Sequence, residues 1–179
     1  ESPGDQRPAD GESLSFTSPP LAEAMNLLGY PEVQLTLKVD QPLALVAVRL
    51  CDVDEDGRST LITWGLLNLT HHRSHENPEP LVPGQIYSVT VPLNVMAYRL
   101  PAGHRWRVGI SPTYLRHAWP SPKPVTLTLL LGEGCKLVVP ERPYHPLDDT
   151  LPDFPPAEIA PLEPIETLRH DVRRQTVTR

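Results

Sequence analysis

"LALVAVRLCDVDEDGRSTLITWGLLNL" (Leu43–Leu69) consists of two apolar runs joined by an acidic turn. Both runs are rich in Val, Leu, Ile, Thr and Trp, most of which favour strands. The turn contains Asp56-Gly57, and both residue types tolerate the positive φ of a tight hairpin. The stretch therefore predicts a β-hairpin. Its first run, "LALVAVRL", is apolar on both faces and is expected in the middle of a sheet.

The turn also contains the spacing D-x-D-x-D-G, with which a calcium-binding EF-hand loop begins. Asp52, Asp54, Asp56 and Gly57 fall in register with the first half of such a loop. The closing position, which needs a bidentate Glu, is Thr63 in this chain. An EF-hand also needs a helix on each side, whereas both flanks here are strand-like. The sequence favours a hairpin tip over a metal loop, and we assign no metal ligand.

Further short strands are expected on both sides of this hairpin. "VQLTLKV" (Val33–Val39) alternates apolar and polar residues, which is the period of a half-buried strand. "HRWRVGIS" (His104–Ser111) alternates similarly, with Arg105 and Arg107 facing outward. "QIYSVTVPL", "VTLTLLL" and "KLVVP" are further strand candidates, and the ambiguous "PLAEAMNLLG" is also assigned as a strand. About eight or nine strands with Gly and Pro turns predict an all-β fold, a jelly-roll β-sandwich.

The chain divides into three parts by composition. Residues 1–12 are polar and are interpreted as a linker from a missing N-terminal domain. Residues 13–140 are assigned to the jelly-roll domain. Residues 141–179 form a Pro-rich C-terminal extension, because eight prolines between Pro140 and Pro164 exclude a helix or a central strand. The apolar residues among those prolines favour an extended segment that docks on a surface.

Composition excludes several classes of function. A net charge of −6 with no basic cluster argues against nucleic-acid binding, which depends on neutralisation of phosphates by Lys and Arg. No apolar stretch reaches the roughly 18 residues that cross a bilayer, and no signal peptide is recognisable. The two cysteines, Cys51 and Cys135, are interpreted as free thiols in a reducing compartment. We therefore expect a cytoplasmic protein.

Two loops contain the candidate functional residues. His71, His72 and His75 could bind a metal, but a loop does not guarantee that they converge, so a solvated or interface loop is favoured. In "SPTYLRHAWPSPKP" (Ser111–Pro124), proline-stiffened aromatic residues offer contact area with little loss of entropy. Alternatively, Trp119 could plug one end of the sandwich, or form a platform for a sugar.

No catalytic machinery or cofactor site is recognisable in the sequence. The nucleophile elbow G-x-S-x-G is absent, because Pro112-Thr113 follow Gly109-Ile110-Ser111. Glycine-rich phosphate loops are absent too. We assign no catalytic residue, no cofactor and no metal to this chain.

Several segments together resemble the C-terminal domain of the CocE/NonD hydrolases, the group that includes cocaine esterase and is related to X-Pro dipeptidyl-peptidases. The resemblance covers roughly Ser15 to Pro143, in collinear order, through "FTSPPL", "VRLCDVDEDGRSTLITWGLLNLTHH", "HENPEPLVPG", "AYRLPAGHRWRVGISPTY" and "WPSPKPVTLTL". It implies a galactose-binding-like jelly roll packed against an N-terminal α/β-hydrolase domain that carries the Ser-Asp-His triad. No triad position of the family maps onto this sequence.

The resemblance implies a noncatalytic domain of a serine hydrolase that cleaves ester or X-Pro amide bonds. Such a domain would shape the substrate cleft, and it would help to hold subunits together as a homo-oligomer. Residues expected at the domain interface or cleft wall are Tyr114, Trp119, Pro120, Ser121, Pro122, His71 and His72. The alternative function is that of a carbohydrate-binding module, because jelly rolls often serve as lectins.

Overall fold

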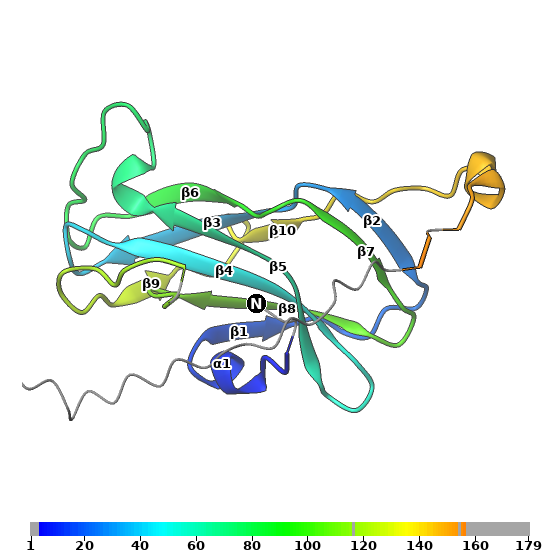
Figure 1. Ribbon diagram of the computed structural model, residues 1–179. Coiled ribbons are helices and arrows are strands. Elements are labelled where there is room, and N and C mark those ends of the chain that lie inside the picture. The colour runs from blue at the N-terminus through cyan, green and yellow to red at the C-terminus, as the bar shows by residue number, and fades with distance from the viewer. Residues whose placement is uncertain (1–3, 116, 154, 157–179) are drawn as a thin grey trace, which may run out of the picture. The chain divides into compact units, whose positions relative to one another are not determined.

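The computed structural model describes residues 4–115, 117–153 and 155–156. They form two units, one up to Tyr144 and one from His145 onward. The first unit contains a short helix and ten strands (Figure 1): α1 (Arg7–Gly11), β1 (Leu14–Thr17), β2 (Met25–Gly29), β3 (Glu32–Val39), β4 (Leu45–Val53), β5 (Ser59–Asn68), β6 (Tyr87–Pro92), β7 (Met96–Leu100), β8 (Arg105–Ser111), β9 (Leu127–Leu129) and β10 (Lys136–Val138). A 3-10 turn, η1 (Leu69–His71), follows β5.

The strands form three antiparallel sheets. One sheet has the order β1-β8-β4-β5, and β10, β3 and β6 form a second, in which β9 also pairs with β3. Strands β2 and β7 form a third, two-stranded sheet. The prediction of an all-β fold is confirmed, and the arrangement is consistent with a sandwich. Strand β4 lies between β5 and β8, as its two apolar faces predict.

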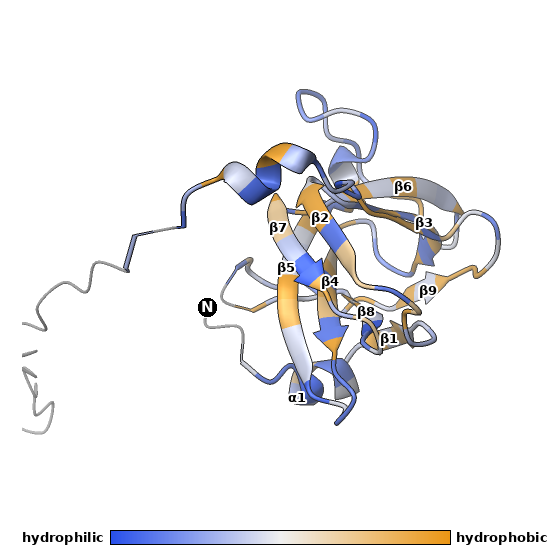
Figure 2. Cartoon of the chain, turned by 90° about the vertical axis from the view of Figure 1, so that its right-hand side faces the viewer, coloured by the Kyte–Doolittle hydropathy of each residue, from blue (hydrophilic) through white to orange (hydrophobic). Residues whose placement is uncertain are grey.

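Alternating side chains fill the core between the two larger sheets. Strand β3 contributes Val33, Leu35, Leu37 and Val39, which are all at most 3% exposed. Strand β4 contributes Val46, Val48 and Leu50 to the same cluster, facing β3 and β6. Full burial of one such side chain contributes about 1.5–3 kcal/mol, so this alternation stabilises the fold. Figure 2 shows hydrophobic residues concentrated on the strands and hydrophilic ones on α1.

The acidic turn is the tip of a hairpin, as predicted. Strands β4 and β5 pair antiparallel from Leu45 to Val53. At the tip, Asp54 accepts backbone hydrogen bonds from Gly57 (3.1 Å) and, through its side chain, from Arg58 (2.8 Å). Gly57 has φ of 81°, the left-handed conformation that glycine adopts without strain.

The structure differs from the sequence-based predictions in several places. The ambiguous segment contains a strand, but only from Met25 to Gly29, and strand β7 was not predicted at all. Residues within the expected linker form α1, which covers the outer face of β8, so Arg107 is half-buried rather than facing solvent. Ion pairing makes this possible, because Arg107 contacts Asp10 of α1.

The second unit is described only in part. Its described residues include a 3-10 helix, η2 (Pro146–Thr150), although the proline-rich segment was predicted to contain no helix. The short turn forms because His145 and Asp148 cap it reciprocally and Pro146 stands in its first turn. The rest of the predicted extension, from residue 157, lies outside the described residues.

Candidate interface loops

Three connections lie at one end of the sandwich: residues 40–44, 69–86 and 112–126 (Figure 1). The last of these contains the predicted contact residues. Its first part is held by backbone hydrogen bonds of 3.1 Å from His117 and Ala118 to the carbonyl oxygen of Tyr114. Its last residue, Thr126, donates a backbone hydrogen bond of 2.8 Å to Asp40, and this bond lowers the pKa of the Asp40 carboxyl. The first part of the loop is therefore a local turn, and its last residue is tied to the connection that follows β3.

Tyr114 lies in a group of three aromatic rings that contact one another. The ring of His117 is centred 4.4 Å from that of Tyr114 and 4.1 Å from that of Trp64 on β5. Trp64 and Tyr114 meet edge to face at 5.4 Å. Contacts of this kind stabilise beyond the burial of area alone. The half-buried Tyr114 therefore supports the loop from beneath.

Trp119 protrudes from the same loop, with 90% of its surface exposed. The alternative that this side chain plugs the end of the sandwich is therefore wrong. A hollow of about 430 Å³ on one side is lined by Trp119, the residues up to Pro122, Leu43 and Thr70. A second hollow of about 410 Å³ is lined by Trp119 and residues such as Leu115. Trp119 thus forms a ridge between two hollows.

The histidine loop borders this surface. His71 and His72 directly follow Thr70, which lines the larger hollow. The Nδ1 atoms of His71 and His75 lie 3.2 Å apart, so the structure brings these two together. His72 instead bonds the carbonyl oxygen of Leu69 at 2.8 Å and packs edge-on against Tyr87. Within the described part of the chain, no three His, Cys, Asp or Glu side chains converge on a metal-sized site.

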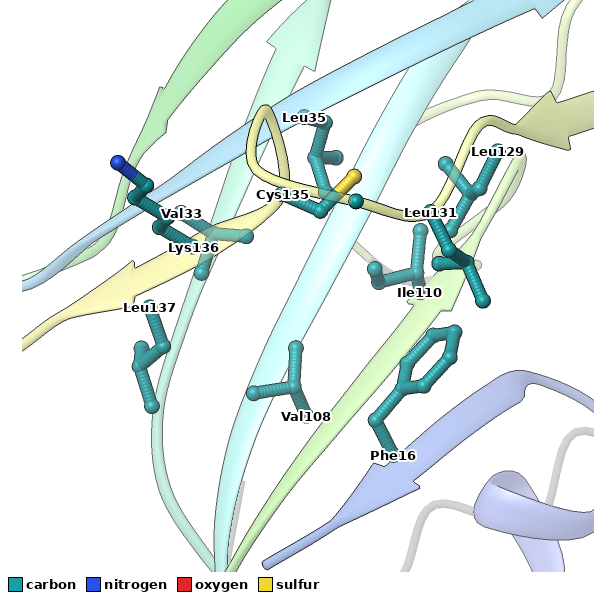
Figure 3. A pocket seen from close by; sticks show the side chains of 11 residues that line it. Phe16, Val33, Leu35, Val108, Ile110, Leu129, Leu131, Cys135, Lys136 and Leu137 are labelled. Atoms are coloured by element: carbon teal, nitrogen blue, oxygen red, sulfur yellow. The ribbon is translucent and has the colours of Figure 1, made fainter.

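An apolar cavity of about 320 Å³ lies elsewhere, between β1 and β8 on one side and β3, β9 and β10 on the other. Figure 3 shows Phe16, Ile110 and Leu131 pointing into it, while the amino end of Lys136 points away. The thiol of Cys135 lies at its edge and contacts the carbonyl oxygen of Leu130 at 3.4 Å. Such a lining can bury apolar groups.

Sequence reasoning missed a buried polar cluster at the opposite end of the sandwich. Asp52, 6% exposed, accepts a hydrogen bond from Tyr98 (2.7 Å) and lies 2.7 Å from Nδ1 of His104. The pKa of the Tyr98 phenol is raised, mainly by burial and secondly by the hydrogen bond to Asp52. The sequence did contain a signal for this cluster, the aspartate inside an apolar strand. A charged group that is buried needs partners, so Asp52 indicated that polar groups would lie around it. Asp52 therefore holds the β7–β8 turn against β4 and does not point into the hairpin tip.

Comparison with known proteins identifies the family of the chain. A sequence profile matches residues 2–145, and its family is described as the X-Pro dipeptidyl-peptidase C-terminal non-catalytic domain. The chain belongs to this family. Together with a cocaine esterase among the relatives, membership confirms the resemblance to CocE/NonD hydrolases drawn from the quoted segments. The candidate interface loops therefore belong to an X-Pro dipeptidyl-peptidase C-terminal domain, and this family is described as non-catalytic.

Two relatives are much longer than this C-terminal domain. The Xaa-Pro dipeptidyl-peptidase of Lacticaseibacillus casei is 26% identical over 127 residues, covering 51% of this chain and 16% of the relative. The cocaine esterase of a Rhodococcus species is 25% identical over 158 residues, covering 84% of this chain and 27% of the relative. The chain thus spans about a quarter or less of these relatives.

A solved structure supports the fold alone. The aminopeptidase of a marine sediment archaeon, Thaumarchaeota archaeon, superposes with a TM-score of 0.69 at 18% identity. The match covers 78% of this chain and 27% of the aminopeptidase.

No helix among the described residues has both the length and the apolar character to cross a membrane.

Proposed function

We propose that this chain is the noncatalytic C-terminal domain of a longer serine hydrolase that cleaves ester or X-Pro amide bonds. The chemistry would proceed on an N-terminal α/β-hydrolase domain of the same polypeptide, through an acyl-enzyme on a serine. Family membership and the greater length of the relatives support the assignment of catalysis to a different domain of the polypeptide. A jelly-roll topology with a galactose-binding-like fold remains part of the proposal.

The interface loops supply the surface that meets the hydrolase domain in this proposal. The observation that carries it is Trp119, which exposes 90% of its surface. Its loop is held by the contact of Tyr114 with Trp64 of β5 and by the bond from Thr126 to Asp40. A large aromatic side chain on an ordered loop is typical of the centre of a protein interface. Pro120, Ser121 and Pro122 continue this surface, and the stiff backbone loses little entropy on contact.

The histidine loop, beside the larger hollow, would form the rim of the same contact. His71 and His72 follow directly on Thr70, which lines the hollow beside Trp119. The domain would thereby complete one wall of the substrate cleft and stabilise the assembly. Self-association of the hydrolase into a homo-oligomer stays a prediction. The free thiols of Cys51 and Cys135 support a reducing, cytoplasmic compartment.

Fluorine NMR of protein labelled with 5-fluorotryptophan tests the interface. The chain has three tryptophans, and the variant Trp119→Phe identifies the resonance of Trp119. In the 179-residue chain this resonance should show a full solvent isotope shift between H₂O and D₂O. In the longer hydrolase the shift should fall, because the side chain becomes buried. An unchanged shift of Trp119 in the longer protein would contradict the proposed interface.

A carbohydrate-binding function is the second candidate. The ridge of Trp119 between two hollows favours it, because an exposed aromatic ring can stack on a sugar. A titration with mono- and oligosaccharides, followed by tryptophan fluorescence, separates the two functions. Saturable binding at millimolar sugar or tighter, lost in Trp119→Ala, would favour the lectin, whereas our proposal predicts no change.

A further inference from the structure

Residues 5–13 lie across the outer face of the sheet formed by β8, β4 and β5. The backbone amide of Gln6 donates a 2.7 Å hydrogen bond to the carbonyl oxygen of Ser59, at the start of β5. Asp5 makes an isolated antiparallel bridge with Thr60. The side-chain oxygen of Gln6 accepts a 3.0 Å bond from Arg49 of β4. The segment is therefore tied to two strands before the first strand of the domain begins.

A buried ion pair provides a further attachment. Asp10 is 7% exposed, and its two carboxylate oxygens lie 3.2 Å from Arg49 and 3.1 Å from Arg107. Arg49 is itself 3% exposed and donates a further hydrogen bond of 3.0 Å to the hydroxyl of Ser13. Removing one partner of a buried pair leaves an uncompensated charge in the interior. Each group therefore depends on the segment staying in place.

The sheet beneath is shaped for this contact. Gly109 of β8 faces the guanidinium of Arg49, and a Cβ atom at Gly109 would lie 2.9 Å from Nη2 of Arg49. The glycine thus leaves room for the guanidinium to lie flat on the sheet and reach Asp10. Arg49 also stands in a central strand, where an arginine is rarely fully buried without a partner.

Cys51 is enclosed in the same place. Its side chain is fully buried, and it belongs to the sheet beneath the segment rather than to the main core cluster. Burial first, and then the negative charge of Asp10, raises the pKa of its thiol to about 11. The positive charges of Arg49 and Arg107 act in the opposite direction and lower the pKa of the thiol. Cys51 therefore reports on whether the segment is closed over the sheet.

We propose that residues 5–13 are a strap, clamped by Asp10 between Arg49 and Arg107, that fixes the direction in which the polypeptide enters the domain. The strap closes over Cys51 and opens as a local unit, without unfolding of the sandwich. In a longer hydrolase, the strap would couple the position of the preceding domain to the sheet. This last clause rests on the proposed function, whereas the clamp itself does not.

Thiol reactivity tests the clamp in the full 179-residue chain. The variant Cys135→Ser leaves Cys51 as its single thiol, and the reagent is 5,5′-dithiobis(2-nitrobenzoate) at pH 8 without denaturant. Adding Asp10→Asn should accelerate the labelling of Cys51 by about 100-fold, because it leaves Arg49 buried without its carboxylate. Asp5→Asn is the matched control, since it removes a carboxylate whose ion pair with Arg7 is exposed, and it should change the rate less than about threefold.

A milder variant covers the case in which Asp10→Asn does not fold. Ser13→Ala removes the hydrogen bond from Arg49 and the bond that the hydroxyl donates to the carbonyl oxygen of Ala9, and it should accelerate labelling by about fivefold. The labelling rate should be nearly independent of urea below the unfolding transition, as expected for a local opening. Equal rates in the parent, Asp10→Asn and Ser13→Ala would overturn the clamp. So would labelling that follows global unfolding at every urea concentration.

The outcome is separable from that of the proposed function. Labelling of Cys51 reports on the strap whichever domain precedes it, while the fluorine signal of Trp119 reports on the interface. A closed strap together with a solvent-exposed Trp119 in the longer hydrolase would retain the clamp and reject the interface.

Discussion

Tyr98 donates a 2.7 Å hydrogen bond to the buried carboxylate of Asp52, and this bond joins strand β7 to strand β4. Burial and the bond together raise the pKa of the phenol. The folded protein therefore holds the phenolic proton more tightly than the unfolded chain. Its stabilising effect is complete below about pH 10, the ordinary pKa of tyrosine, and is lost as the pH rises above that value.

Replacing this tyrosine should reveal the pH dependence. Tyr98→Phe should lower the free energy of unfolding by about 1–3 kcal/mol at pH 7, because a buried carboxylate loses a donor. The deficit should shrink as the pH rises above about 10. Urea unfolding from pH 7 to 11 measures it, with the exposed Tyr30→Phe as control. A deficit that stays constant up to pH 11 would argue against the role of this proton.

Calcium should not stabilise the chain. Asp52, which would be the first ligand of an EF-hand loop, is engaged by Tyr98 and His104 instead. A ligand that binds the folded state at a hundred times its Kd would add about 2.7 kcal/mol. We therefore expect millimolar calcium to shift the Tm by less than about 1 °C relative to EDTA. A saturable rise of several degrees would restore the metal-loop interpretation.

Gly65 should tolerate no side chain. A Cβ atom there would clash with the backbone oxygen of Pro92 and lie 2.8 Å from Cδ2 of Leu93. Gly65→Ala should therefore lower the free energy of unfolding by about 1–3 kcal/mol or more. Gly11→Ala is the matched control, because a Cβ atom at Gly11 would have no neighbour within 4 Å, and it should change stability by at most about 0.5 kcal/mol. Equal midpoints in urea for both variants would be inconsistent with this packing.

Much of the fold follows from the two-residue period of the strands. Val33, Leu35, Leu37 and Val39 face the core as their alternation predicts, and the hairpin forms where Asp56-Gly57 stands. Strand β7 was missed because only its two end residues, Met96 and Leu100, are buried, so its sequence shows no continuous alternation. The hydrophobic pattern therefore locates a strand well only where apolar residues alternate along it or fill it.

Polar contacts between distant residues could not be predicted in the same way. The strap packs through Asp10, Arg49 and Arg107, and hydrophobic periodicity carries no information about such pairs. A charged residue inside an apolar strand was the available signal, at Arg49 and at Asp52, but it does not name its partner.

The candidate interface loop was chosen from the sequence, and its role stays a prediction, while its geometry could not be predicted. The loop of Trp119 and Pro120 was singled out, yet a tryptophan beside prolines could have faced inward or outward. Tyr114 stacks with His117 beside Trp64, a residue 50 positions earlier, which sequence spacing could not reveal.

Labelling with a fluorophosphonate probe tests the central claim, that this chain is the noncatalytic part of a serine hydrolase, most directly. Intact-mass spectrometry of the purified 179-residue chain after incubation with the probe should show no adduct. Hydrolysis of p-nitrophenyl acetate by the same sample should equal that of buffer, while the longer hydrolase should react at one serine outside this chain. A stoichiometric adduct on a serine of these residues would contradict the account.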